Sequence, residues 1–353
     1  MIRRATFLIA AVIAICCVSG FVHAQRGSDY PFFVQPMTVQ NVRALADRLE
    51  LSRDQRRVLL EQYEAYNQRF EDLQEGAVAD YMDAGIDTVM RVQPWGGDFQ
   101  IPSREEVNKM VSEGLAIIRS FGKIDDAFFD DITPLLSETQ LIRLEQSRRF
   151  RALDRYGILH RNMVGAINEG ASPDLIGIMR RVEVEPEIQV QVDEVLSEYA
   201  KRTIAGLRSF ESTGKELIEA LLDEVDSRGI RDMDMMAMME YFGSEERQNE
   251  LKSLFDPLTQ PIQDKAAILA RENLRAYRAL IGVLPPDAAR DVRTRFVRKG
   301  YRQADQGVSS SRSSLVRLRE LDLSEDINAE VDAAIVQLDE KYDSLLSSML
   351  SAI

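Results

Sequence analysis

The sequence predicts an all-α fold made of long antiparallel helical hairpins in an elongated array, and three observations lead to it. Apolar residues recur three and four positions apart in every long segment, which is the period of an α-helix. No stretch of useful length alternates with the two-residue period of a β-strand. Short phrases that end one helix and begin the next recur along the 353 residues, and the clearest is LELSRDQ at residues 49–55.

Two of these phrases share the pattern Leu-Ser-x-x-Gln. They comprise Leu51, Ser52 and Gln55 in the first, and Leu136, Ser137 and Gln140 in the second. In each phrase the serine hydroxyl can accept a hydrogen bond from the backbone N–H three residues later, while the glutamine reaches back to the serine N–H. This capping box predicts that a new helix begins directly after each serine. Looser versions stand at residues 182–186, 284–287 and 321–324.

The first residues have the order of a secretory signal peptide. Arginines at positions 3 and 4 precede an apolar run at residues 7–15 and a small-residue cleavage site, VHA, at residues 22–24. The apolar run is too short to span a bilayer. We therefore expect residues 1–24 to be a signal peptide cleaved near Ala24, with no integral membrane segment afterwards and a periplasmic or other extracytoplasmic location.

The mature chain should be acidic and without cysteine. Cleavage removes Cys16 and Cys17 and leaves His160 as the only histidine, so disulfide and thiol chemistry are not expected. The full chain already carries a formal charge of -14, which argues against nucleic acid as a partner. Residues 25–37 contain two prolines and three aromatic residues, and we expect them to be extended and to lie in a groove.

The helical part is expected to be a repeat. Residues 38–171 form a first helical unit, residues 172–308 a second, and residues 309–353 a C-terminal half unit, giving two and a half copies of about 140 residues. The first unit has a short helix from Thr38, a long one after Ser52, a non-helical loop at residues 93–99, a helix under a capping box at Ser103, and a helix after Ser137. The alternative is that unrelated amphipathic helices align by chance.

Within this plan, two basic turns stand out from an acidic chain. The first contains Arg148, Arg149, Phe150, Arg151 and Arg155, and the second contains Arg293, Arg295, Phe296, Arg298 and Lys299. Arginine and aromatic side chains together attract and hold varied partners, so these residues are candidates for a surface that binds protein clients. The alternative is that the arginines pair with acidic helices of the same molecule.

Two further clusters have competing interpretations. Four carboxylates, Asp125, Asp126, Asp130 and Asp131, could attract a cation, although a solvated acidic face is the simpler interpretation. Five methionines at residues 233–239 suit core filling, an adaptable binding surface or a Cu(I) site, in that order of preference. Enzyme motifs such as a phosphate-binding glycine loop or H-E-x-x-H are missing, so we expect no catalytic activity and no cofactor.

The capped junctions resemble the LTxxQ motif of the periplasmic Spy and CpxP stress-protein family, with serine in place of threonine, and the resemblance covers residues 38–160. It implies an all-helical, often dimeric protein that acts as a chaperone without ATP or senses envelope stress. The resulting hypothesis is an exported helical binding protein of the cell envelope that holds protein partners or unfolded clients, with a homodimer as a candidate state. The alternatives are a structural scaffold without clients and, third, a metal-responsive periplasmic protein.

Overall fold

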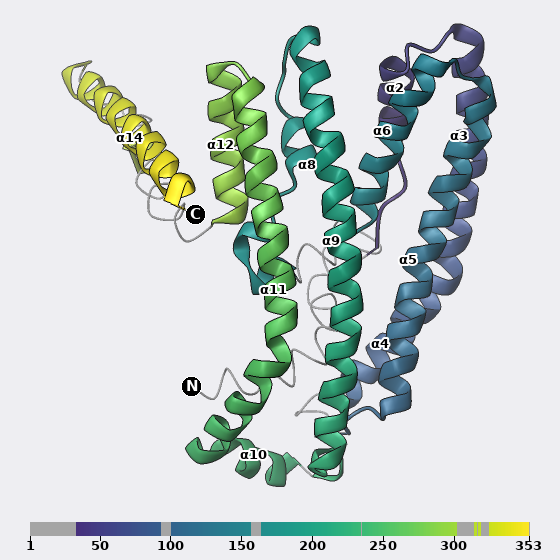
Figure 1. Ribbon diagram of the computed structural model, residues 1–353, viewed down its shortest axis with the longest axis vertical. Coiled ribbons are helices and arrows are strands. Elements are labelled where there is room, and N and C mark those ends of the chain that lie inside the picture. Colours follow the sequence, from purple (N-terminus) through teal and green to yellow (C-terminus); the bar gives the residue numbers. More distant parts are fainter. Residues whose placement is uncertain are drawn as a thin grey trace. The chain divides into compact units, whose positions relative to one another are not determined.

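The computed structural model describes residues 33–92, 100–156, 164–233, 235–301, 314–315, 317–318 and 325–352. Over these residues the regular secondary structure is helical and contains no strand, which confirms the all-α prediction (Figure 1). The predicted signal peptide, the loop at residues 93–99, His160 and the phrase at residues 321–324 lie outside the described residues.

In the first half of the chain, the described residues form five α-helices. They are α2 (Val39–Arg48), α3 (Arg53–Leu73), α4 (Ala79–Val92), α5 (Arg104–Ile132) and α6 (Glu138–Arg155), with a π-helical turn η1 (Gln74–Val78) and a 3-10 turn η2 (Thr133–Leu135). Because η1 joins α3 to α4 without a break, the long helix predicted after Ser52 runs on to Val92. Helices α3 and α5 lie side by side along their lengths (Figure 1).

The described residues of the second half form two very long helices, α9 and α11, with shorter helices between and after them. Its elements are η3 (Glu169–Ala171), α8 (Leu175–Met179), α9 (Pro186–Ser227), η4 (Ile230–Asp232), α10 (Met235–Gly243), α11 (Glu245–Val283), α12 (Pro286–Gly300) and α14 (Glu325–Ala352). Pro257 and Pro261 lie inside α11 without ending it.

Capping boxes begin four of the described helices, as the sequence predicts for three of them. The pairs Ser52 with Gln55, Ser103 with Glu106, and Ser137 with Gln140 each make both reciprocal hydrogen bonds, and Thr38 with Asn41 adds a fourth. Each cap satisfies two backbone N–H groups that the first helical turn leaves without partners.

Contacts divide the chain into two compact units that are each built from separate stretches of sequence. One unit takes the chain up to residue 163 together with Ile204–Lys265, and the other takes Val164–Thr203 together with Ala266–Ile353. Helices α9 and α11 therefore each contribute residues to both units. The predicted unit boundary at residue 171 and the repeat of about 140 residues stay predictions.

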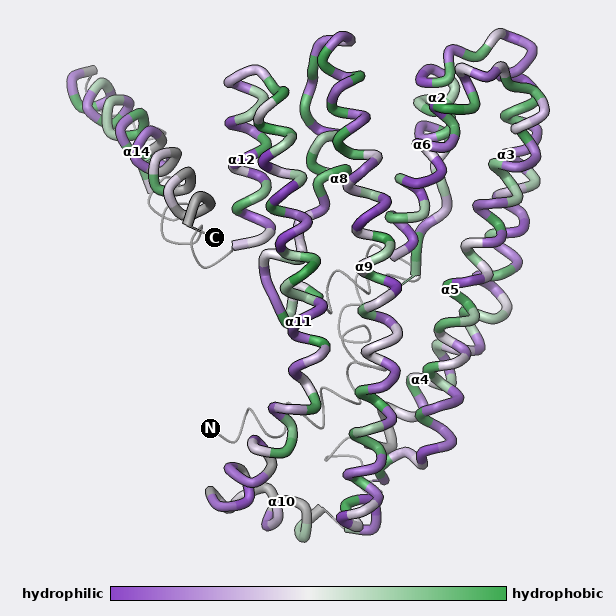
Figure 2. Tube along the Cα trace, viewed as in Figure 1, coloured by the Kyte–Doolittle hydropathy of each residue, from purple (hydrophilic) through white to green (hydrophobic). Residues whose placement is uncertain are grey.

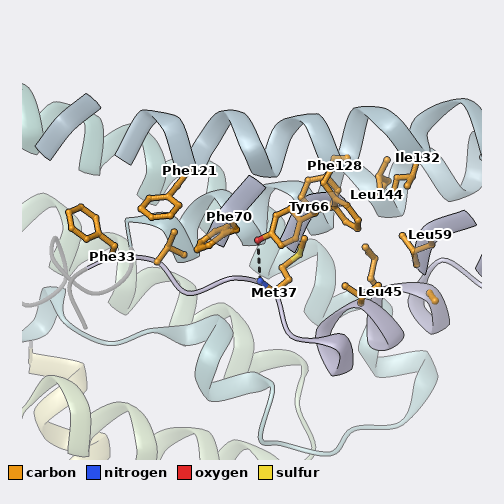
Figure 3. Packing of buried hydrophobic residues seen from close by; sticks show 14 of the residues in the cluster. Phe33, Met37, Leu45, Leu59, Tyr66, Phe70, Phe121, Phe128, Ile132 and Leu144 are labelled. Carbon is orange, nitrogen blue, oxygen red and sulfur yellow. Dashed lines mark hydrogen bonds between the residues drawn. The ribbon is translucent and has the colours of Figure 1, made fainter. Parts of the chain in front are cut away.

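Aromatic side chains from α3 and α5 pack together in the core of the first unit. Tyr66 and Phe70 of α3 pack against Phe121 and Phe128 of α5, with ring centroids 4.6 Å apart for Phe70 and Phe121 (Figure 3). Hydrophobic and hydrophilic residues alternate around each helix, as an amphipathic helix with one buried face requires (Figure 2). Burial of these rings contributes to the driving force for packing the bundle.

Candidate functional site

Residues 33–37 form a non-helical segment that lies against the helices of the first unit, and we call it the N-terminal strap. The side chains of Phe33, Val34 and Met37 are only 5%, 8% and 7% exposed. Figure 3 shows Phe33, Phe121, Phe70 and Tyr66 following one another along this segment. These five residues are non-helical and bury their apolar side chains, while the extended segment expected over residues 25–37 stays a prediction.

Three hydrogen bonds join the helices to the backbone of the strap. The Met37 N–H donates to the Tyr66 hydroxyl at 3.1 Å, the Tyr63 hydroxyl donates to the Met37 carbonyl at 2.8 Å, and Arg151 Nη2 donates to the Gln35 carbonyl at 2.8 Å. Backbone groups are the same in every sequence, so these three contacts do not select for side chains. Selection comes from apolar contacts such as those of the Phe33 ring.

The Phe33 ring contacts two aromatic residues from different helices. Its centroid lies 6.0 Å from that of Tyr81 in an edge-on arrangement and 5.8 Å from that of Phe121. We call Tyr63, Tyr66, Tyr81, Phe121 and Arg151 together the strap surface. This surface combines aromatic faces with hydrogen-bonding groups that can reach the backbone of an extended chain.

A buried polar network supports the strap surface from below. Asp125 is 1% exposed, and its Oδ1 accepts from Arg151 Nε at 2.9 Å and from the Tyr66 hydroxyl at 3.1 Å. Arg151 Nη2 also donates to the Tyr66 oxygen at 3.1 Å, while Asp125 Oδ2 has no hydrogen bond and lies 3.8 Å from Arg155 Nε. The tyrosine hydroxyl thus donates once and accepts twice, which is its full capacity.

Burial shapes the protonation of this network. Desolvation raises the pKa of the Asp125 carboxyl above its ordinary value, and the charges of Arg151 and Arg155 offset only part of that rise. Desolvation and the charge of Asp125 also raise the pKa of Tyr66, which therefore stays a neutral hydroxyl. A buried ion pair of this kind adds little net stability but fixes geometry. Here it fixes where Arg151 and Tyr66 present their strap contacts.

The second unit contains a related arrangement with a neutral amide. The Tyr199 hydroxyl lies 3.0 Å from Asn273 Oδ1 and 3.4 Å from the Pro173 carbonyl, and Asn273 Nδ2 donates to the Gly170 carbonyl at 3.1 Å. As in the first unit, a buried tyrosine on a long helix bonds to a polar side chain of another helix and to a non-helical segment. No arginine takes part in these three contacts.

The two Leu-Ser-x-x-Gln phrases lie side by side, and the glutamine of each contacts the other phrase. Gln55 Nε2 donates to the Leu135 carbonyl at 2.6 Å and lies 3.3 Å from Gln140 Oε1, while Gln140 Nε2 lies 3.5 Å from the Glu50 carbonyl. Each glutamine therefore caps its own helix and also contacts the residue that stands two positions before the other serine. The local cap was predictable from sequence, whereas this reciprocal contact was not.

Arginines of the first basic turn make ion pairs and hydrogen bonds within their own unit. Arg148 pairs with Asp130 and Glu145 and lies 5.7 Å above the Phe129 ring, and Arg155 donates to the Gly122 carbonyl at 2.8 Å. Phe150 is buried, with the Arg48 guanidinium 4.9 Å above its ring. Arg149 is exposed.

The second basic turn also buries its aromatic residue. Phe296 is fully buried and stacks on Tyr277 at 4.4 Å, Arg295 pairs with Asp291 at 2.8 Å, and Arg293 is half-buried. Arg298 and Lys299 are exposed. These placements correct the expectation that Phe150 and Phe296 offer apolar contacts to a client, because both rings belong to the core.

Three of the four carboxylates in the acidic cluster lie at the surface, with side chains 39% to 67% exposed, and the fourth is buried. Asp125 is buried beside Arg151, and the carboxylates of Asp126, Asp130 and Asp131 pair with Arg155, Arg148 and Arg69 respectively. No group of three or more histidine, cysteine or acidic side chains within the described ranges could hold a metal ion.

The methionine cluster at residues 233–239 is only partly described. Met236 is 73% exposed, so core filling does not apply to it, and Met233 is half-buried. A shallow cleft of about 590 Å³ lies elsewhere in the first unit, between α5 and the part of α9 that belongs to that unit. It is lined by Glu105, Asn108, Lys109, Val111, Ser112, Lys215, Ile218 and Glu219.

Asp125 and Arg151, the central pair of the site, each had a signal in the sequence. Asp125 stands four residues after Phe121 and three before Phe128, and Arg151 stands seven after Leu144, so helical spacing places both on buried faces.

Among the helices in the described part of the chain, none is long and apolar enough to cross a membrane. No protein-family model, curated protein or solved structure matches the chain.

Proposed function

We propose that this chain is an exported helical binding protein of the cell envelope that holds extended segments of other polypeptides without ATP. One observation carries the proposal: the first unit already holds an extended segment, the strap, through three backbone hydrogen bonds and buried apolar side chains. A surface that holds one segment in this way can hold another with similar apolar residues, because the backbone contacts do not depend on sequence. Such strand-like recognition of a backbone is a common route to tolerant peptide binding.

The resemblance to the Spy and CpxP family adds independent support for chaperone-like activity. It rests on the two capped junctions, whose glutamines join the helix starts of α3 and α6. The junctions stabilise the bundle that presents the strap surface, and they are not themselves proposed to touch a client.

The experiment is aggregation suppression combined with site-specific crosslinking. At stoichiometric amounts and without ATP, the purified full chain should slow aggregation of a chemically denatured reporter protein. A photocrosslinking residue in place of Tyr81 should capture that reporter, while the same residue in place of Ile142, which is 65% exposed on α6, should not. Equal capture at both positions would show that binding is not specific to the strap surface. Unaltered aggregation would remove the proposal.

A structural scaffold without clients is the second candidate, and the internal pairing of the basic turn favours it. Arg148, Arg151 and Arg155 all bond to α5 of their own molecule instead of facing outward. Under this alternative, substituting Arg148 or Arg155 lowers the melting temperature, and the chain leaves reporter aggregation unchanged. The aggregation assay therefore separates the two functions.

A further inference from the structure

The strap lies on the same surface that the proposed function assigns to a partner. Two segments cannot both accept the Arg151 hydrogen bond that the Gln35 carbonyl now takes, or both occupy the position of Phe33 between Tyr81 and Phe121. Binding of a partner on this surface therefore requires the strap to leave.

We propose that the strap is an intramolecular competitor that closes the strap surface until an extended partner segment displaces it. This inference rests on the proposed function and adds its regulation and its partner class. The partner is an extended peptide with an aromatic residue in the place of Phe33, an aliphatic one in the place of Val34, and a long apolar one in the place of Met37.

When the strap leaves, the Tyr63 hydroxyl loses its bond to the Met37 carbonyl, but the buried polar groups beneath the strap stay paired. Arg151 and Tyr66 lose their contacts to strap backbone but retain each other and Asp125, at 2.9 to 3.1 Å. No buried charge is therefore left without a counter-charge, so the strap surface can remain folded after the strap has left. Its exposed aromatic faces then gain from covering by any suitable apolar segment.

The strength of the competition follows from the chain connection. Met37 directly precedes Thr38, the N-cap of α2, so the strap competes as part of the same molecule, at an effective concentration of the order of millimolar or above. The free peptide must compete with that local concentration. Weakening the strap without touching the surface should therefore strengthen binding of a free peptide on the order of tenfold or more.

The test uses the full chain and a fluorescent peptide with the sequence of residues 31–38. Binding is followed by fluorescence anisotropy for the unmodified chain, for a loosened double variant with Phe33→Ser and Val34→Ser, and for Gln35→Ala. Gln35→Ala is the matched control, because it alters the same segment at an exposed side chain and leaves the backbone carbonyl in place. A peptide of the same composition in scrambled order controls for general stickiness.

The expected result is at least tenfold tighter peptide binding by the loosened variant than by the unmodified chain or Gln35→Ala, with no gain for the scrambled peptide. Equal binding by all three chains would overturn the competition while leaving the proposed function standing. Binding by none of them overturns the competition too, and the proposed function falls with it only if the unmodified chain also fails to suppress aggregation. If the loosened variant loses its helical circular dichroism signal, Met37→Ala replaces it in the binding assay. Equal peptide affinity of Met37→Ala and the unmodified chain would then overturn the proposal that the strap competes.

Discussion

Removing the Asp125 carboxylate should be among the most damaging single changes in the first unit. Asp125→Ala deletes the acceptor of two hydrogen bonds and leaves the Arg151 guanidinium, which is itself buried, without its closest counter-charge. Breaking a buried ion pair from one side typically costs 3–5 kcal/mol, because a charge stays buried and uncompensated. We therefore expect the free energy of unfolding to fall by about 3–5 kcal/mol.

Urea denaturation followed by circular dichroism measures this change, and a second variant isolates its cause. In the double variant Asp125→Ala with Arg151→Met the stranded charge is gone, so stability should recover by at least about 1 kcal/mol relative to Asp125→Ala alone. Asp126→Ala is the control, since Asp126 is half exposed and its pair with Arg155 spans 3.6 Å. That substitution should cost no more than about 1 kcal/mol. Equal losses for Asp125→Ala and Asp126→Ala, or no recovery in the double variant, would refute the reasoning.

Three further predictions follow from the same contacts. Gln55→Ala and Gln140→Ala should each cost about 1 kcal/mol and show a coupling energy of about 0.5 kcal/mol or more in a double-mutant cycle, whereas additive losses would mean that the two caps act separately. Because the pKa of Asp125 is higher in the native than in the unfolded state, the native state holds an extra proton only in the pH window between these two pKa values. This residue's contribution to stability from protonation is therefore fully present below the unfolded pKa, about 4, and is lost as pH rises through the window, above which Asp125 is the carboxylate that pairs with Arg151. The stability of the unmodified chain relative to Asp125→Asn should accordingly fall with rising pH in denaturation curves, and a rising difference would contradict the sign. Phe150→Ala and Phe296→Ala should each cost about 3–5 kcal/mol in thermal or urea unfolding, while a loss under about 1 kcal/mol would show that the rings are not in the core.

Local features were predictable from sequence because their physics is local. The caps at Ser52, Ser103 and Ser137 depend on residues three positions apart, and each forms as expected. The apolar stripe through Tyr66 and Phe70 likewise packs inward because period-3.6 spacing places both on one face.

The candidate site was less predictable because residue type and residue position gave opposite signals. Asp125 and Arg151 are charged, and charged residues are rarely fully buried unless they are paired. Residue type therefore predicted that both side chains are exposed, while their helical register predicted that both are buried. Only the presence of an oppositely charged partner on the other helix makes burial favourable, and the sequence does not show that pairing. Phe150 and Phe296 show the reverse error, because neighbouring arginines made two core rings resemble a binding surface.

Reciprocal contact between the glutamine caps constrains how this bundle can change length during evolution. Gln55 and Gln140 tie the start of α3 to the start of α6, so the chain between them leaves that point and must return to it. An extra helical turn in α3 would carry its far end onward by about 5.4 Å, and α5 would need the same extension to come back in register. Insertions should therefore be accepted in matched pairs, one in each of the two helical arms. A single-residue insertion beside either serine would disrupt the caps of both helices, because the two glutamines contact each other.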